Sequence, residues 1–219
     1  MILHTNGDLR QIILIYNIMH DLIQIIEILS SEEVKKLNEY IDTLTFQPNT
    51  VFGEGEKATA RTEVRSSTGC ILSEDETFTK NLHLKMNAAL EEYKDRVSKI
   101  NVTFEHFPVP GGYDTNSWRE AIQILDYREG QKYNMHHDTA DLRRQEYYRT
   151  ISIILYLNND FEGGNTVFSH KKYKPLPGQA LIFPSNWCYP HAGEPVTSGK
   201  KRVAVTWYYV EARTEDEYI

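Results

Sequence analysis

The hydrophobic positions of this 219-residue chain change their period along its length. In the N-terminal part, apolar residues recur every three or four positions, which is the spacing of an amphipathic helix. Two helices are predicted there, over residues 31–44 and 76–100. In the C-terminal part, the apolar runs are short and are divided by Gly, Pro, Asn and Asp, a pattern typical of an antiparallel sandwich or barrel.

The first predicted helix has a clear start signal. Ser30 is followed three residues later by Glu33, which is the arrangement of a capping box. Residues 22–29 before it are mostly apolar, and their period fits either a strand or the tail of a helix. Residues 47–63 have no period and several Gly, small and charged residues, so an exposed, mobile loop is predicted there.

Six strands are predicted after the Pro- and Gly-rich segment 108–112. They cover residues 121–127, 133–138, 150–157, 165–168, 179–183 and 202–210. An α+β fold uses every element, with a double-stranded β-helix (jelly-roll or cupin-like) core and the N-terminal helices packed on one face. One domain over residues 1–219 is expected, with a helical and strand support region at 1–104 and the jelly-roll core at 105–212.

Composition narrows the function classes. The formal charge of -7 and the scattered Lys and Arg argue against a nucleic-acid surface, although a local basic groove around Arg143, Arg144 and Arg149 stays open. Cys70 and Cys188 are far apart, which favours reduced buried thiols over a disulfide framework or a thiolate zinc site. The chain has neither a membrane-length apolar run nor a cleavage-site pattern, so a cytoplasmic protein without a membrane partner is expected.

One short motif points to metal chemistry. His136 and Asp138 stand two apart at the end of an apolar run, so their side chains leave the same face of a strand. His137 between them points to the opposite face, and His191 lies in a later strand-like segment. Two imidazoles and one carboxylate form the facial triad that holds non-haem Fe(II) and leaves positions open for other ligands. His136, Asp138 and His191 are therefore the predicted metal ligands.

Six blocks of residues surround this motif between residues 60 and 210. They are Arg65-Ser-Ser-Thr-Gly69, Glu120-Ala-Ile-Gln123, Tyr127-x-x-Gly130-Gln-x-Tyr133-x-x-His136-x-Asp138, Arg149-x-x-Ser152-x-x-x-Tyr156-Leu157, Gly163-Gly164-x-Thr166-x-Phe168, and His191-x-x-x-Pro195-Val196-x-x-Gly199-x-Lys201 with Trp207. In order and spacing, the chain resembles the Fe(II)- and 2-oxoglutarate-dependent dioxygenases, and among them the prolyl 4-hydroxylases. The resemblance implies Fe(II), 2-oxoglutarate as co-substrate, O2, and ascorbate as reductant.

The resemblance also implies a site for 2-oxoglutarate. Its keto and C1 carboxylate oxygens would chelate the iron, and its distal carboxylate needs a fixed cation. Lys201 stands where the family places that cation, and strand parity puts it on an apolar inner face. The Tyr127 hydroxyl could reach the same carboxylate, and Ser152 could play a weaker role beside Lys201. A solvated lysine, a core tyrosine and a core serine are the competing interpretations.

Substrate positions are implied around the mouth of the metal site. They are Arg65, Ser67, Glu120, Tyr133, Arg149 and Trp207. The arginine at 149 would hydrogen-bond a peptide carbonyl, and the aromatic faces suit a pyrrolidine ring; surface salt bridging is the alternative for Arg65 and Glu120. Residues 49–63 and 139–148 border these positions and are expected to be lids, with ungated solvated loops as the alternative.

The triad and the resemblance together predict an oxidoreductase that hydroxylates a prolyl residue in a peptide or protein partner and releases succinate and CO2. An oxygenase acting on a free amino acid or another small molecule would use the same triad. From other classes, a non-catalytic iron- or oxygen-sensing module and a jelly-roll zinc hydrolase stay open. The zinc hydrolase would leave Lys201 and Tyr127 without a purpose.

Overall fold

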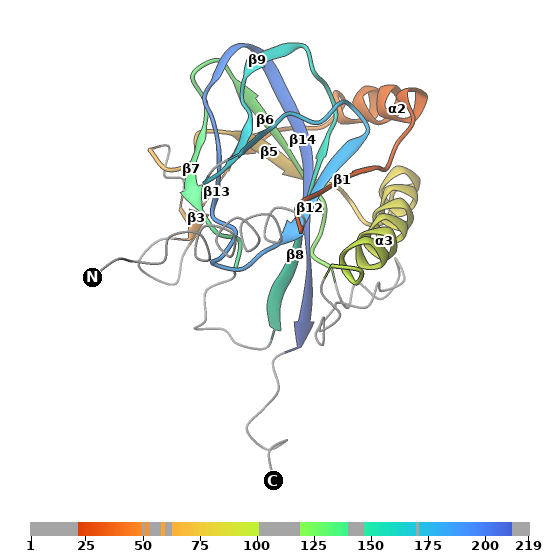
Figure 1. Ribbon diagram of the computed structural model, residues 1–219. Helices are drawn as coiled ribbons and strands as arrows, with labels where there is room; N and C mark the ends of the chain where they lie inside the picture. Colours follow the sequence, from red (N-terminus) through yellow and green to blue (C-terminus); the bar gives the residue numbers. More distant parts are fainter. Residues whose placement is uncertain are drawn as a thin grey trace, which may run out of the picture.

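The computed structural model describes residues 22–49, 51–52, 58–59, 63–100, 119–139, 147–169 and 171–211. Within these ranges, two helices lie beside two layers of β-sheet (Figure 1). The helices are α2 (Ser31–Ile41) and α3 (Thr77–Val97). The strands are β1 (Gln24–Glu27), β2 (Gln47–Pro48), β3 (Val51–Phe52), β4 (Ala58–Thr59), β5 (Thr68–Ile71), β6 (Gln123–Arg128), β7 (Tyr133–His136), β8 (Tyr147–Tyr156), β9 (Phe161–Gly163), β10 (Thr166–Phe168), β11 (Lys171–Tyr173), β12 (Gln179–Pro184), β13 (His191–Gly193) and β14 (Val196–Glu211).

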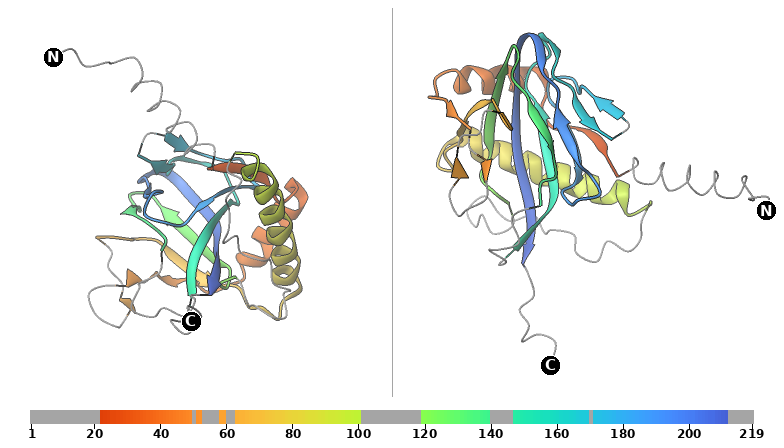
Figure 2. Two further views of the ribbon diagram at one scale, coloured as in Figure 1. Left: turned by 60° about the horizontal axis from the view of Figure 1, so that its bottom comes forward. Right: turned by 90° about the vertical axis from the view of Figure 1, so that its left-hand side faces the viewer.

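Two antiparallel sheets form the core. The larger sheet runs β1-β12-β8-β14-β6-β5-β2, with β9 paired to β14, and the smaller sheet runs β11-β10-β13-β7. Strands that are distant in sequence are neighbours in both sheets, as β8 is with β12 and β14. This is the predicted double-stranded β-helix. Figures 1 and 2 show α2 and α3 on the outer side of the larger sheet, with β7 and β13 on the opposite side.

The helices form where the hydrophobic period predicts them. At the start of α2, the Ser30 Oγ accepts the Glu33 N–H, and the Glu33 carboxylate accepts the Ser30 N–H at 3.0 Å, which completes the capping box. The observed helices are slightly shorter than the predicted ones, because their last residues form turns instead. Neither α2 nor α3 has an apolar stretch of the length that a membrane crossing requires.

Residues 22–29 contain the strand β1, so the structure decides between the two alternatives left open for this segment. The predicted loop 47–63 needs correction, because it contains β2 and the antiparallel pair of β3 with β4. The strand β2 pairs with β5, with Gln47 opposite Gly69. Gly69 lies in a tight place, since an added Cβ would lie 2.5 Å from the Ile124 carbonyl oxygen of β6 and 2.7 Å from the Asn49 side chain. Backbone pairing of such short strands needs no hydrophobic period, which is why the pattern missed it. Cys70 and Cys188 are free thiols as expected, but they are half-buried rather than buried.

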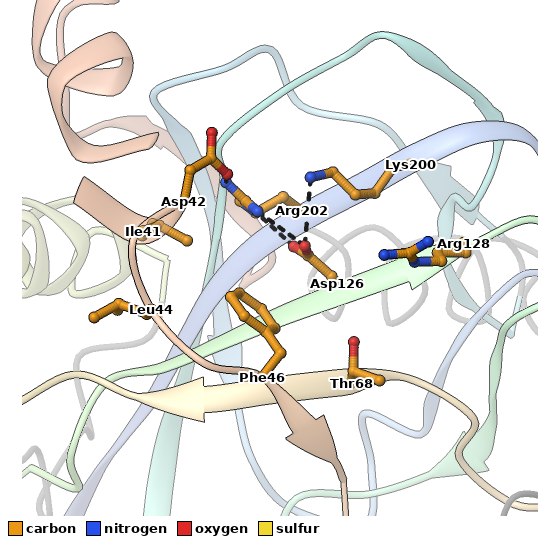
Figure 3. Close-up of a pocket in the computed structure, with 9 residues that line it drawn as sticks. All are labelled: Ile41, Asp42, Leu44, Phe46, Thr68, Asp126, Arg128, Lys200 and Arg202. Carbon is orange, nitrogen blue, oxygen red and sulfur yellow. Dashed lines mark hydrogen bonds and ion pairs between the residues drawn. The ribbon is translucent and has the colours of Figure 1, made fainter. Parts of the chain in front are cut away.

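Arg202 ties α2 to the outer face of the larger sheet. Its guanidinium donates two hydrogen bonds to Asp126, at 2.7 and 2.9 Å, and one to Asp42 at 2.7 Å. Figure 3 shows this network along a pocket of about 240 Å³, where Lys200 also reaches Asp126 and Phe46 lies below. Arg202 and Asp126 are buried, whereas the Asp42 side chain is 63% exposed. The positive charge of Arg202 is therefore compensated mainly by the carboxylate of Asp126.

Removal of the buried partner should be far more damaging than removal of the exposed one. Asp126→Ala is expected to lower the free energy of unfolding by about 3–5 kcal/mol, because it leaves a buried guanidinium without its carboxylate. Asp42→Ala, at an exposed partner of the same arginine, is expected to cost less than about 1 kcal/mol. Urea unfolding at neutral pH measures both. Equal losses in the two variants would contradict this account of the network.

Candidate metal centre

Three potential metal ligands converge between the two sheets. The pairing of β13 with β7 sets His191 directly opposite His136, and Asp138 follows β7 two residues later. Asp138 Oδ1 lies 3.4 Å from His136 Nε2, and Asp138 Oδ2 lies 3.5 Å from His191 Nε2. All three ligand atoms lie within 4.8 Å of one another. Ligands at right angles on a metal with bonds of about 2.1 Å lie about 3 Å apart, so this spacing suits a small divalent ion.

Backbone carbonyls orient both imidazoles. His136 Nδ1 lies 2.7 Å from the Asn134 carbonyl oxygen, and His191 Nδ1 lies 3.2 Å from that of Tyr189. A carbonyl accepts hydrogen bonds only, so each Nδ1 carries a proton, and in the neutral ring each Nε2 then keeps a lone pair that faces Asp138. His137 is exposed, as its strand parity predicted. The donor set of two Nε2 atoms and a carboxylate fits a non-haem Fe(II) ion.

The protonation states also suit metal binding. Burial opposes ionisation of Asp138, but the neighbouring His191 and His136 outweigh it and hold the pKa of that carboxyl well below its usual range. Burial is also the main reason why the pKa of His191 lies below its ordinary value. A charged carboxylate and a neutral imidazole are the forms that bind a metal without first losing a proton.

Lys201 is a buried cation on the inner face of the larger sheet. It lies opposite Tyr127 in the ladder of β14 with β6, and its Nζ donates to the Gly164 carbonyl at 2.7 Å. The ring centroids of Tyr156 and Tyr127 lie 4.9 and 5.7 Å from Nζ. Burial, assisted by the charge of Lys174, lowers the pKa of Lys201 to about 7. Within the described part of the chain, Lys201 has no carboxylate in ion-pair contact, so an anionic ligand would supply the missing countercharge.

The hydroxyl of Ser152 forms its hydrogen bonds with Asp138 and Ser185, and not beside Lys201 where the sequence analysis had placed it. Its hydroxyl donates to Asp138 Oδ2 at 2.7 Å and lies 2.8 Å from Ser185 Oγ, so its hydrogen bonds belong to the metal centre. Near Lys201 the structure places Tyr156 instead, whose hydroxyl lies 2.6 Å from Thr166 Oγ1. Sequence reasoning gave no site role to Ser185, Tyr156 or Thr166. Strand parity offered a signal for Tyr156, because it shares a face of β8 with Ser152.

Three of the predicted substrate residues form one group beside Asp138. Arg149 makes a two-pronged ion pair with Glu120, with Nη2 donating to Oε2 at 2.6 Å. The Arg149 guanidinium lies 3.9 Å from the Trp207 ring centroid, and its Nη1 donates to the Asp138 carbonyl at 3.3 Å. Glu120 therefore takes part in a salt bridge, as the competing interpretation for this residue had it, but the pair is partly buried rather than at the surface.

The other three substrate candidates gather beside His136. The Tyr133 ring stacks on the His136 ring at 3.6 Å between centroids. The Arg65 guanidinium lies 5.0 Å from the Tyr133 ring centroid, and its Nε donates to Ser67 Oγ at 3.2 Å. The two groups thus contact two different ligands of the triad. Most of the two expected lids, and Arg143 and Arg144 of the basic groove, lie outside the described residues.

The sequence is similar to a known protein family and to several curated proteins. Residues 122–209 match the model of the 2OG-Fe(II) oxygenase superfamily. A putative prolyl 4-hydroxylase of Acanthamoeba polyphaga mimivirus is 40% identical over 107 residues, which cover 41% of this chain and 44% of that protein. The probable prolyl 4-hydroxylase 9 of Arabidopsis thaliana is 28% identical over 183 residues, which cover 70% of this chain and 56% of the relative. The chain thus spans about half the length of these curated relatives.

Solved structures show the same fold. The viral collagen prolyl hydroxylase of Paramecium Bursaria Chlorella virus-1, in complex with 2OG, has a TM-score of 0.60 at 21% identity, over 86% of this chain and 96% of that one. A prolyl hydroxylase from Trichoplax adhaerens, in complex with a peptide fragment of the hypoxia inducible factor oxygen degradation domain, has a TM-score of 0.59 at 18% identity, over 94% of both chains.

Loss of the central carboxylate should abolish tight metal binding. Asp138→Asn keeps the shape of the side chain but removes the charge that compensates a divalent cation. The affinity for Co(II) is expected to fall by more than about 100-fold, because changes at residues that merely support a ligand already cost about 10–100-fold. Titration with Co(II), followed by absorbance, measures the loss. His137→Ala at the exposed neighbour serves as the control, and a comparable loss in that variant would argue against this ligand set.

Proposed function

We propose that this chain, a prolyl 4-hydroxylase-like 2OG-Fe(II) oxygenase, hydroxylates a prolyl residue in a peptide or protein and converts 2-oxoglutarate to succinate and CO2. One combination of features carries the proposal: a His-Asp-His set at β7 and β13 occurs together with Lys201, a buried lysine of β14 without a carboxylate partner among the described residues. Fe(II), when bound with 2-oxoglutarate and O2, supplies the oxidising chemistry. The protein residues bind, orient and enclose the reactants.

His136, Asp138 and His191 would hold Fe(II) through two Nε2 atoms and one carboxylate. Three protein ligands leave positions for the two chelating oxygens of 2-oxoglutarate and for O2. A jelly-roll zinc hydrolase would use the same three residues but would give Lys201 no role. The pairing of the triad with this lysine therefore favours the oxygenase.

Lys201 would bind the distal carboxylate of 2-oxoglutarate. The Nζ is buried and is held in place by the Gly164 carbonyl, so it is oriented before the ligand arrives. Tyr127 lies opposite it and is also buried, and its hydroxyl could donate to the same carboxylate. The neighbouring Tyr156 would close the pocket against water with its ring.

A prolyl residue would enter between the two groups of substrate candidates. The faces of Tyr133 and Trp207 suit a pyrrolidine ring, while Arg65 and Arg149 could donate to carbonyls of the adjoining peptide. The names of the relatives favour a peptide over a free amino acid, since they are prolyl hydroxylases and one solved relative contains a peptide fragment. Hydroxylation of a peptide is accordingly the leading assignment.

Turnover of 2-oxoglutarate tests the assignment directly. Purified protein with Fe(II), ascorbate and air should form succinate faster when a proline-rich peptide is present, and the peptide should gain one oxygen atom by mass spectrometry. His136→Ala should abolish both signals because it removes one ligand from the triad. A folded, iron-loaded protein that forms no succinate would contradict the oxygenase. Succinate formation without any response to the peptide would contradict the prolyl substrate alone.

The affinity for 2-oxoglutarate should depend on pH through Lys201. Below about pH 7 the lysine is protonated and ready to bind a carboxylate, whereas above it the ligand must first recruit a proton. The dissociation constant of 2-oxoglutarate is therefore expected to rise about tenfold per pH unit above that pKa. Calorimetric titration of Mn(II)-loaded protein at several pH values measures this slope.

Lys201→Arg is the matched control, because arginine stays protonated throughout this range. Its dissociation constant should be nearly independent of pH, even where its affinity at low pH is weaker than that of the wild type. Parallel pH profiles in the two proteins would exclude Lys201 as the group that binds the distal carboxylate.

A further inference from the structure

Two buried hydroxyls connect the carboxylate of Asp138 to the larger sheet. Ser152 Oγ lies 2.7 Å from Asp138 Oδ2 and 2.8 Å from Ser185 Oγ. Each serine is only 1% exposed, so neither hydroxyl exchanges its partner freely with water. Ser152 comes from β8, and Ser185 follows the end of β12.

The direction of these hydrogen bonds follows from the charge of Asp138. An ionised carboxylate only accepts hydrogen bonds, so the single hydrogen of the Ser152 hydroxyl points to Oδ2. The Ser152 oxygen can then only accept from Ser185, which must be the donor of the second bond. The hydroxyls therefore form a directed chain from Ser185 through Ser152 to the carboxylate.

Ser185 also holds the backbone of the metal-ligand segment. Its carbonyl accepts the Asp138 N–H at 3.1 Å and the Thr139 hydroxyl at 3.2 Å. Its own N–H donates to the Thr150 carbonyl at 2.8 Å. Ser152 is fixed in the middle of the larger sheet, where β8 pairs with both β12 and β14. The chain of hydroxyls is thus anchored in well-paired strands.

The two oxygens of the carboxylate have different surroundings as a result. Each oxygen lies close to one imidazole, Oδ1 at 3.4 Å from His136 Nε2 and Oδ2 at 3.5 Å from His191 Nε2, but Oδ2 also receives the Ser152 hydroxyl. A carboxylate that binds with one oxygen occupies one coordination position, whereas a carboxylate that binds with both occupies two. Positions left open by the protein are what a facial triad needs for its other ligands.

We propose that Ser185 and Ser152 form a hydroxyl relay that orients Asp138 to bind the metal through Oδ1 alone. Both serines are positioning residues, because they act through the carboxylate and offer no ligand atom themselves. The relay replaces the role beside Lys201 that the sequence suggested for Ser152. The relay depends on one part of the proposed function, the binding of a divalent metal ion by Asp138. It does not depend on which substrate the protein uses.

Binding of Co(II) in the absence of any substrate tests the relay. Ser152→Ala should weaken Co(II) binding by roughly 10–100-fold, the usual cost of losing a group that supports a metal ligand. Its visible spectrum should also change, because the freed second oxygen can enter the coordination shell. Ser152→Thr keeps the hydroxyl and should restore both affinity and spectrum. Ser185→Ala should show a smaller loss.

The double variant separates a relay from two independent effects. Because Ser185 acts through Ser152, the variant Ser152→Ala/Ser185→Ala should bind Co(II) no more weakly than Ser152→Ala. Thr79→Val is the control, since it removes a buried hydroxyl of α3 that has no hydrogen-bond partner among the described residues and should leave Co(II) binding unchanged. Circular dichroism of each variant checks that the fold is retained.

Three results would overturn the relay: wild-type Co(II) affinity and spectrum in folded Ser152→Ala, additive losses in the double variant, or a loss confined to 2-oxoglutarate affinity at saturating metal. The last result would return Ser152 to the co-substrate site. The outcome is independent of turnover. A protein that shows the predicted Co(II) behaviour but forms no succinate would contradict the hydroxylase and leave the relay intact.

Discussion

The antiparallel pairing of β13 with β7 is the constraint on which the rest of the site depends. It sets His191 opposite His136, although the two residues are far apart in sequence. The strand end then places Asp138 next to both imidazoles. A shift of this register by one residue would turn one imidazole to the other face of the smaller sheet and would leave no metal site. The backbone hydrogen bonds between β13 and β7 therefore set the positions of the candidate metal ligands.

The larger sheet contributes a lysine and a serine hydroxyl on the face that packs against the smaller sheet. Its inner face carries Lys201, a buried cation, and Ser152, which donates to the carboxylate of Asp138. Its outer face carries Arg202, whose charge is already compensated by Asp126. The two cations differ in their partners, because Arg202 is paired with Asp126, whereas Lys201 has no carboxylate in ion-pair contact among the residues that the structure describes. A buried group without its countercharge is expected where a protein binds a charged molecule.

Part of this arrangement follows from strand parity, and part from the family resemblance. The spacing of two between His136 and Asp138 predicted a shared face, and the resemblance, supported by strand parity, predicted that Lys201 points inward; the structure places all three accordingly. The contacts of Ser152 and Ser185 were not predictable, because they depend on which strands become neighbours. That order is set by long-range pairing in the jelly roll, which no local pattern encodes.

The central claim is that the two sheets together form one site for a metal and a 2-oxo acid. Anaerobic titration of the Fe(II)-loaded protein with 2-oxoglutarate tests it most directly, since chelation of Fe(II) by a 2-oxo acid produces a visible charge-transfer band. The band should appear with 2-oxoglutarate and not with succinate, and Lys201→Ala should require much more co-substrate to reach it. An iron-loaded protein that never develops the band would contradict the account.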